Sequence, residues 1–214
     1  MHLTPTLETS LRLTDALFAR RNDKGGEPIA RHYHRVLAYL AIDPPHDTSS
    51  RGLHYHAIEV YMTKTVAVLH DVLEDTPLTA EDLLALGYHR DIVADIVTLT
   101  IREGESYTTY LDRLIATGSI RVLRTKLADN ADNTCPARMA LLADYDAQRF
   151  AQRYAGVRER LLKRLAELTG KPACKGGYSQ CVRDTNNDGD CLTCSKLGTV
   201  SDHPSPGELC GGER

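Results

Sequence analysis

The sequence predicts an all-α domain followed by an irregular tail. Apolar residues recur at intervals of three and four over most of residues 1–170, and no segment shows the strict alternation of a half-buried strand. Short breaks rich in Gly, Pro and Asn separate these periodic segments. Large apolar side chains become rare after residue 170, so that part cannot build a core of its own. We therefore expect a helical bundle over residues 1–170 and a Cys- and Gly-rich tail over residues 171–214.

The composition is that of a globular protein without a pronounced charge. Hydrophobic residues make up 42% and charged residues 26% of the 214-residue chain, which is enough to bury a core. The net charge of −3 gives no general attraction to nucleic acid. No apolar run approaches the roughly 20 residues of a membrane helix, and the N-terminus lacks the apolar core of a signal peptide. We therefore expect a cytoplasmic protein without a membrane-spanning helix.

Amphipathic spacing places most of the expected helices. Periodic apolar residues predict helices over residues 7–20, 28–40, 57–69, 91–101 and 146–168. The segment 43–52 is rich in Pro, Ser and Asp and should be a loop. Pro136 interrupts the pattern over residues 121–144, so a kink or a new helix start is expected there.

Two further helices carry clear start and stop signals. Thr79 and Asp82 have the spacing of a capping box, and the short helix that they begin should end near Gly87. Ser106 is a typical N-cap for a helix over residues 107–116, which Gly118 should stop.

Four groups that can hold a metal or a proton lie at the end of the apolar helix 57–69. His70 and Asp71 are adjacent, and Glu74 and Asp75 follow one turn later. A buried His beside an Asp needs partners, and a divalent cation such as Mn, Fe or Zn satisfies both. A hydrogen bond between His70 and Asp71 at a surface helix end would explain the dipeptide equally well.

A second polar motif lies within the pattern over residues 121–144. Asp129, Asp132 and Asn133 fall within about one helical turn of one another, and Asn133 shares the face of Asp129 at i+4. Asp129 could therefore point into a site with Asn133 beside it. A solvated helix face would produce the same pattern.

These motifs and an N-terminal segment occur in the order typical of a known family. The chain has Gly26-Glu27-Pro28 leading to His32, then His70-Asp71 with Glu74-Asp75, then Lys126-Leu127-Ala128-Asp129 with Asn133. In this order it resembles the HD-domain phosphohydrolases, and most closely the hydrolase domain of the Rel/SpoT alarmone enzymes and the stand-alone small alarmone hydrolases. The resemblance covers about residues 7–165 and implies an HD-domain helical bundle.

The resemblance implies a metal site. Its ligands would be His32, His70, Asp71 and Asp129, and the metal would be Mn²⁺ or another divalent cation. Two imidazoles and two carboxylates leave coordination positions open, as a hydrolytic site requires.

The resemblance also implies roles for residues around the metal. Glu74 and Asp75 would position or deprotonate the attacking water. Lys24 and Lys126 would bind pyrophosphate, and Asn133 would bind ribose hydroxyls. An ordinary solvated charge would explain either lysine equally well.

The activity implied is removal of the 3′-pyrophosphate from a guanosine or adenosine alarmone such as (p)ppGpp. The nucleotide would be the partner of the site, and a companion alarmone synthetase would be a further partner. One alternative is hydrolysis of another nucleotide, and a second is a non-catalytic regulatory module that binds nucleotides. The acid pair Glu74 and Asp75 argues against a pure binder, which needs no groups that activate water.

Two departures from the family pattern affect the expected specificity. Asp23 stands where the alarmone enzymes usually have an Arg that stacks on guanine, although Arg20, Arg21 or Arg31 could substitute. The usual Asp-Arg-x-His-Asn is here Asp129-Asn-Ala-Asp-Asn133. We therefore expect similar cleavage of guanosine and adenosine alarmones, and an improved KM for guanosine after Asp23→Arg.

Several nearby residues are weaker candidates. His34, His54 and His56 do not have the spacing of the family motifs, and surface or packing roles explain them better. Tyr107, Tyr110 and Arg113 share one helix face, where they could wall a nucleotide pocket or simply pack in the core and at the surface.

The tail offers a possible structural zinc site. Four cysteines, Cys174, Cys181, Cys191 and Cys194, could bind one Zn²⁺, but only the last pair has the usual spacing. A disordered tail with reduced thiols is the alternative. Asp184 to Gly189 copy the start of a calcium loop, but Ser195 replaces its last acid, so no calcium site is predicted.

Overall fold

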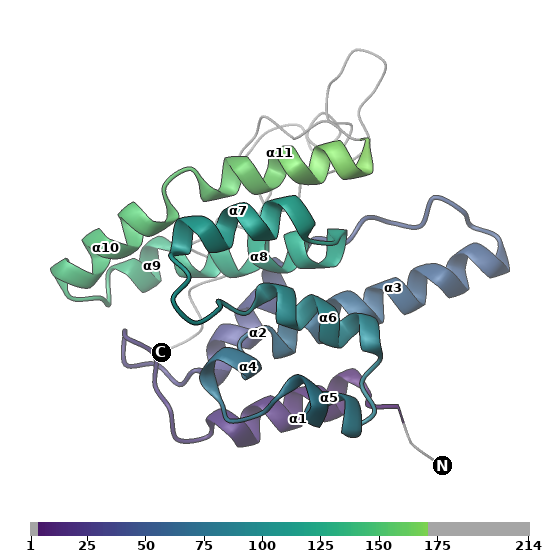
Figure 1. Cartoon of the computed structure of the whole chain (residues 1–214), viewed down its shortest axis with the longest axis horizontal. Coiled ribbons are helices and arrows are strands. Elements are labelled where there is room, and N and C mark those ends of the chain that lie inside the picture. The colour runs from purple at the N-terminus through teal and green to yellow at the C-terminus, as the bar shows by residue number, and fades with distance from the viewer. Residues whose placement is uncertain (1–3, 171–214) are drawn as a thin grey trace.

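The computed structural model describes residues 4–170, and helices account for most of them. The helices, shown in Figure 1, are α1 (Leu7–Phe18), α2 (Ala30–Tyr39), α3 (Ser50–Leu69), α4 (Val72–Asp75), α5 (Ala80–Ala85), α6 (Arg90–Leu99), α7 (Tyr107–Thr117), α8 (Ile120–Asn133), α9 (Pro136–Met139), α10 (Asp144–Tyr154) and α11 (Val157–Thr169). Within residues 4–170 the strand-like pairing is limited to one isolated bridge between Asn22 and Pro28. The prediction of an all-α domain is therefore confirmed.

Some predictions fall on parts of the chain that the structure does not describe. The Cys-rich tail and the proposed zinc ligands Cys174, Cys181, Cys191 and Cys194 lie outside the described residues. Within residues 4–170, none of the helices has both the length and the apolar content needed to cross a membrane.

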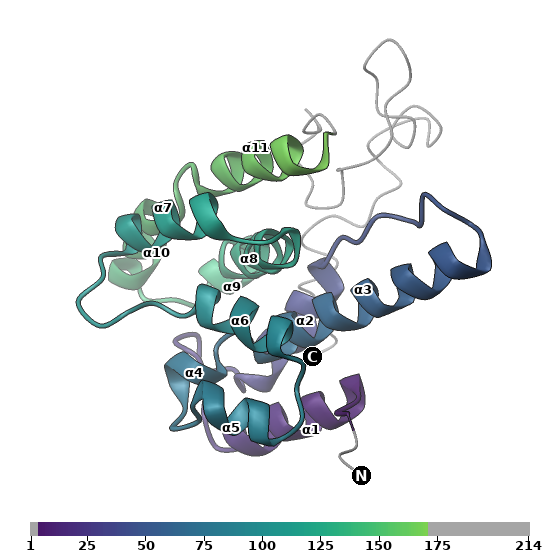
Figure 2. The same cartoon turned by 45° about the vertical axis from the view of Figure 1, so that its right-hand side comes forward.

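Helix α8 is the centre of the bundle. It packs against α2, α3, α6, α7, α9 and α11. Figures 1 and 2 show α7 and α11 on one side of α8 and α2, α3 and α6 on the other. Between Val122 and Asp132 nearly every residue is buried, including Lys126 and Asp129. The polar motif of α8 is therefore not a solvated helix face, and that alternative is wrong.

The core consists of large apolar side chains contributed by most of the longer helices. The fully buried ones include Phe18, Tyr33, Leu69, Ile96, Leu114, Leu123 and Leu161. Each aliphatic or Phe side chain of this kind contributes about 1.5–3 kcal/mol when it leaves water. The core therefore holds α2, α3 and α8 together, and these are the helices that carry the candidate site.

The predicted caps are present. Thr79 and Asp82 form the capping box of α5, and the Ser106 hydroxyl accepts a hydrogen bond from the Thr109 amide at the start of α7. Gly118 ends α7, and a Cβ added there would lie 2.5 Å from the Leu114 carbonyl oxygen. The glycine is therefore required by the close approach of the chain to its own helix.

Helix α3 begins earlier than predicted. It starts at Ser50, so the loop predicted over residues 43–52 is wrong at residues 50–52, and the helix begins before the predicted residue 57. The Ser49 hydroxyl caps the helix by accepting a hydrogen bond from the Gly52 amide. The first half of α3 extends beyond the other helices (Figures 1 and 2). Its side chains Leu53 and Tyr55 are exposed, so this half lacks the buried stripe by which a helix is predicted from a sequence.

The predicted last helix is two helices. Gly156 has a φ of 70° and separates α10 from α11, which corrects the single helix predicted over residues 146–168. Such a left-handed conformation is cheap only for glycine. Pro136 is the first residue of the short helix α9, which agrees with the new helix start expected at that position.

Candidate active site

The candidate metal ligands come from three distant parts of the chain. His32 lies in the first turn of α2, His70 and Asp71 lie between α3 and α4, and Asp129 lies on α8. Because α8 packs against both α2 and α3, these side chains meet. The structure thus brings together all four residues that the sequence suggested as ligands.

Each of the four side chains directs one atom toward the other three. His32 Nε2 lies 3.7 Å from Asp71 Oδ2 and 3.4 Å from Asp129 Oδ1. His70 Nε2 lies 3.0 Å from Asp71 Oδ2 and 3.7 Å from Asp129 Oδ1. His32, His70 and Asp71 each offer one ligand atom, and these three atoms lie within 4.8 Å of one another, close enough to hold one metal ion.

Hydrogen bonds to the other ring nitrogens assign the tautomers of both histidines. His32 Nδ1 lies 2.6 Å from Asp132 Oδ2, and His70 Nδ1 lies 2.9 Å from the Ala67 carbonyl oxygen. Both partners are acceptors, so both Nδ1 atoms donate, and both Nε2 atoms face the carboxylates. The buried Nε2 of His70 has no hydrogen-bond partner in the described part of the chain. A cation between two such nitrogens and two carboxylates satisfies all four groups, and this donor set suits Mn, Fe or Zn.

The electrostatics of the cluster favour positive charge. Burial opposes a charge on His70, but the Asp71 and Asp129 carboxylates outweigh it and raise the pKa of His70 to about 9. The pKa of His32 is raised as well, because Asp129, Asp132 and Asp71 outweigh its burial. The cluster therefore stabilises protons or a metal cation between its imidazoles and carboxylates.

A cavity of about 200 Å³ opens at this cluster. Glu74 and Asp75 line it, so the predicted catalytic acids lie beside the predicted metal ligands. Burial raises the pKa of both acids, and the nearby Asp71 charge raises it further. The Glu74 side chain accepts a hydrogen bond of 3.3 Å from the Ile101 amide. A carboxylate with a raised pKa beside the candidate metal ligands is suited to act as a general base.

Lys126 is buried in the wall of the same cavity. Its Nζ lies 2.7 Å from Asp129 Oδ2 and 5.3 Å from the centre of the Tyr110 ring. The alternative of a solvated charge is therefore wrong for this lysine. Its ammonium group binds Asp129, and the residue lines the cavity.

Lys24 and Asn133 occupy different positions. The side chain of Lys24 is 55% exposed, and its Nζ lies 3.6 Å from Asp146 Oδ1. Lys24 lines a second cavity and is not among the residues around the first. Asn133 lines both cavities, and its Nδ2 donates a hydrogen bond of 2.5 Å to Asp129 Oδ1.

The second cavity has a volume of about 280 Å³ and adjoins the first. The two share Asp23, Ile29, Asp75, Asn133 and Arg138. The remaining lining residues of the second cavity are Arg21, Asn22, Lys24, Gly25, Leu141, Leu142 and Phe150. Apolar side chains from the segment before α2, the segment after α9 and helix α10 thus lie beside polar groups near the candidate metal ligands.

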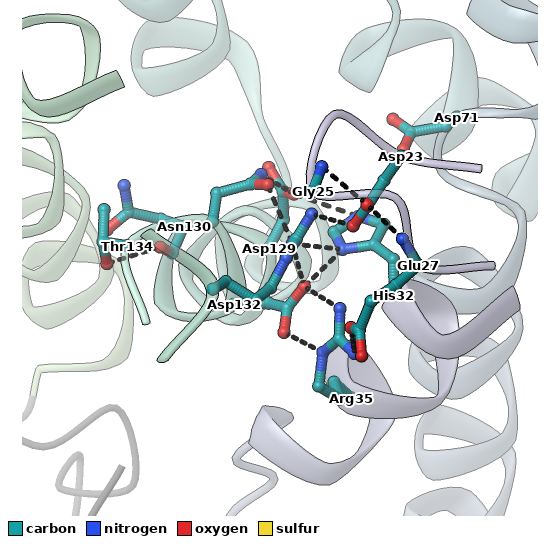
Figure 3. Close-up of polar contacts among 12 residues, drawn as sticks. Asp23, Gly25, Glu27, His32, Arg35, Asp71, Asp129, Asn130, Asp132 and Thr134 are labelled. Atoms are coloured by element: carbon teal, nitrogen blue, oxygen red, sulfur yellow. Dashed lines mark hydrogen bonds and ion pairs between the residues drawn. The ribbon is translucent and has the colours of Figure 1, made fainter. Parts of the chain in front are cut away.

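The network of polar side chains behind His32 was not predicted from the sequence. Asp132 has no exposed surface, and its carboxylate accepts hydrogen bonds from Arg35 and Arg138 as well as from His32. Figure 3 shows His32 and Arg35 both directed toward Asp132. The sequence did mark position 132 as a departure from the family pattern, and that departure was the available signal. Nothing in the spacing indicated Arg35 or Arg138.

Other cavity residues were also missed or left open. Tyr33, Arg153 and Tyr154 line the first cavity and had not been singled out. Tyr110 lines this cavity too, whereas Arg113 binds Glu105 and the carbonyl groups of Thr98 and Thr100.

The histidines judged to be weak candidates stay outside the site. His34, His54 and His56 line neither of the two cavities. His34 lies 3.9 Å from Asp15 at the surface, with more than half of its side chain exposed.

Comparison with solved structures identifies the fold. The chain matches the structure described as "A metazoan ortholog of SpoT hydrolyzes ppGpp and plays a role in starvation responses", with a TM-score of 0.57 and 18% sequence identity. The match covers 79% of this chain and 97% of the metazoan chain. This chain has the fold of a SpoT-like hydrolase. No sequence-family model matches the chain, and no curated protein sequence matches it.

The SpoT-like fold agrees with the family that the sequence motifs suggested. At 18% identity the similarity concerns the fold, and the chemistry has to be argued from the side chains. In this chain the three motif segments meet at one cavity with a group of side chains suited to a divalent metal.

Proposed function

We propose that this protein is a metal-dependent hydrolase that removes the 3′-pyrophosphate from guanosine or adenosine alarmones such as (p)ppGpp. The observation that carries the proposal is the convergence of His32, His70, Asp71 and Asp129 beside two carboxylic acids and a buried lysine. The metazoan SpoT ortholog with the same fold is described as hydrolysing ppGpp, which supports this choice of substrate.

We take Mn²⁺ as the metal, held by His32, His70, Asp71 and Asp129. When bound, a divalent cation neutralises phosphate charge and lowers the pKa of water. Glu74 and Asp75 orient the attacking water, and one of these two carboxylates accepts its proton. Lys126 faces the phosphate groups while it holds Asp129, and Asn133 reaches the sugar end from the border of the two cavities.

Hydrolysis of a panel of nucleotides by the purified protein with Mn²⁺ tests the proposal. We expect release of pyrophosphate from guanosine and adenosine 3′-pyrophosphates. Release from other nucleotides alone would favour a different phosphohydrolase, and binding without turnover would favour a regulatory module. No binding and no turnover with any nucleotide would contradict the proposal.

The Glu74→Gln variant separates chemistry from metal binding. The amide has nearly the same volume but cannot accept a proton, so turnover should fall at least about a hundredfold while metal content is unchanged. Asp71→Asn and His70→Ala should lose both metal and turnover, because each removes a ligand. Full turnover in Glu74→Gln would remove Glu74 from the mechanism, and full metal content in Asp71→Asn and His70→Ala would remove those ligands.

Cytoplasmic location and a companion alarmone synthetase remain parts of this proposal. Both follow from the substrate class, since a hydrolase of this kind works where its nucleotide is made. Cell fractionation and co-purification with a synthetase test them. Recovery of the protein with membranes, or a host without any enzyme that makes such nucleotides, would contradict them.

A further inference from the structure

Arg138 occupies the border between the two cavities. It lies on the short helix α9, which follows α8 in the chain. It lines both the first cavity, which contains the candidate metal ligands, and the second cavity. Its side chain is 15% exposed. Arg138 is therefore within reach of a ligand that extends from one cavity into the other.

Hydrogen bonds from the edge of the guanidinium group fix Arg138 in place. Nη2 donates a hydrogen bond of 2.8 Å to Asp23 Oδ2. Nη1 donates to Asp132 Oδ2 and, at 3.3 Å, to Asn133 Oδ1. Because these bonds lie in the guanidinium plane, the ligand has access mainly to the face of the group.

Asp23 is itself fixed, so the clamp on Arg138 is rigid. Its Oδ1 accepts hydrogen bonds from the amides of Gly25 (2.9 Å) and Glu27 (3.0 Å). The loop before α2 and the segment after α8 are therefore joined at Arg138. A preorganised guanidinium loses little freedom when a ligand binds.

The charges around Arg138 indicate what kind of group it contacts. Two carboxylates, Asp23 and Asp132, flank one guanidinium, so this spot does not attract a phosphate group. The wall of the second cavity beside it contains Ile29, Leu141, Leu142 and Phe150. A flat, uncharged aromatic ring fits between apolar side chains and the face of an Arg.

We propose that Arg138 is a substrate-binding residue that holds the nucleobase of the substrate against the face of its guanidinium in the second cavity. This inference rests on the proposed nucleotide hydrolysis and names the residue that contacts the base. The first cavity, which contains the candidate metal ligands, binds the pyrophosphate. The contact made by Arg138 does not depend on which purine is bound.

Arg35 provides a matched control. Its Nε donates a hydrogen bond of 2.5 Å to Asp132 Oδ1, and its side chain is also 15% exposed. Arg35 therefore contacts the same carboxylate as Arg138 but lines neither cavity. Any effect that passes through Asp132 and His32 should appear in Arg35→Lys and Arg138→Lys alike.

The test compares two kinds of inhibitor, nucleoside monophosphates and inorganic pyrophosphate, in the full-length, Mn²⁺-loaded protein. Guanosine and adenosine monophosphate probe the base contact, and inorganic pyrophosphate probes the metal cavity. We expect the inhibition constants of both monophosphates to be about tenfold higher in Arg138→Lys than in Arg35→Lys, because the lysine keeps the charge but has no planar face. The inhibition constant of pyrophosphate should be the same in the two variants.

Equal monophosphate inhibition constants in the two variants would overturn the inference and leave Arg138 with a structural role through Asp132. A rise for pyrophosphate as large as that for the monophosphates would assign Arg138 to phosphate binding and also overturn it. Asp23→Asn gives a second variant, which keeps the acceptor for the loop amides but loses the charge that holds Nη2. It should weaken monophosphate binding by about threefold, and unchanged binding would contradict the clamp.

Calorimetric titration of guanosine monophosphate into the same proteins measures binding without turnover. It therefore distinguishes a failure of this inference from a failure of the proposed function. If wild-type protein hydrolyses no alarmone but the monophosphate binds with the expected difference between variants, the proposed function fails and the base contact stands. If alarmones are hydrolysed and the variants bind the monophosphate equally, the base contact fails alone.

Discussion

His32 Nδ1 lies 2.6 Å from a carboxylate oxygen of Asp132, a residue with no exposed surface. The contact holds the imidazole in one tautomer and directs Nε2 toward Asp71 and Asp129. Arg35 and Arg138 keep the Asp132 charge satisfied from two sides. The orientation of the proposed metal ligand thus depends on a residue that does not touch the metal position.

The first prediction concerns Asp132→Asn. An amide at this position weakens the bond to His32 Nδ1 and removes the charge that Arg35 and Arg138 share, so that Arg35 keeps only Glu27 and Arg138 only Asp23 as a carboxylate partner. We expect the affinity for Mn²⁺ to fall about ten- to a hundredfold, measured by calorimetric titration.

Asp95→Asn is the control for lost stability. Asp95 is also buried and binds Arg121 and Ser119, but it lines neither cavity. This variant should lose stability without losing Mn²⁺ affinity. Equal Mn²⁺ affinity in Asp132→Asn and wild type would show that Asp132 does not orient His32.

The second prediction revises the effect of Asp23→Arg. The sequence alone led to an expected gain for guanosine, but Asp23 accepts bonds from two backbone amides and binds Arg138. An Arg at position 23 removes these bonds and places two guanidinium groups together. We therefore expect Asp23→Arg to lower the free energy of unfolding by about 1–3 kcal/mol in urea titrations.

The double variant Asp23→Arg/Arg138→Asp tests the pairing directly. It restores opposite charges across the same gap, so the two substitutions should be coupled by about 0.5–3 kcal/mol in a double-mutant cycle. Additive losses would mean that the contact between residues 23 and 138 contributes nothing to stability.

The third prediction is a pH dependence of stability at the junction of α6 and α7. Hydrogen bonds from Arg113 at 2.8 and 2.7 Å outweigh the partial desolvation of Glu105 and lower its pKa from 4.5 to about 2. A pKa that is lower in the folded state adds stability above the unfolded pKa, and this stability is lost as the pH falls toward the folded value.

Glu105→Gln should therefore have a lower Tm than wild type at pH 7. The difference should be constant above about pH 5 and shrink between about pH 4.5 and pH 2. Thermal unfolding followed by circular dichroism at several pH values gives the comparison. A difference that stays the same down to pH 2 would assign it to another cause.

The fourth prediction concerns the proposed domain boundary. Helix α11 ends at Thr169, and Gly170 follows in a left-handed conformation with a φ of 67°. The core residues of this helix, Leu161, Leu162 and Leu165, all precede that point. A chain that ends at Gly170 should therefore keep its helical circular dichroism and bind Mn²⁺. An insoluble product, or one that binds no metal, would make the tail a part of the fold.

Local features of this protein could be read from the sequence because they depend on neighbours within about four residues. The Thr79 capping box, the Ser106 cap and the stop at Gly118 are of this kind. The pairing of Asp129 with Asn133 is an i+4 contact, which the helix itself guarantees.

Features with weak local signals were predicted less well. The first half of α3 is exposed, so its sequence lacks a buried stripe even though Ser49 caps it. Gly156 lies in a segment with helical periodicity, and its left-handed conformation cannot be told from a tolerated helical glycine without the surrounding chain.

The sequence by itself determined the helical class, most helix positions and the four residues that converge as a candidate metal site. Only the tertiary structure decided what surrounds them. It sets His32 against Asp132, 100 residues later in the chain, places Arg138 beside Asp23, and moves Lys24 to the second cavity. The physical reason is that spacing along a helix specifies which side chains share a face, whereas partners on other helices depend on how those helices pack.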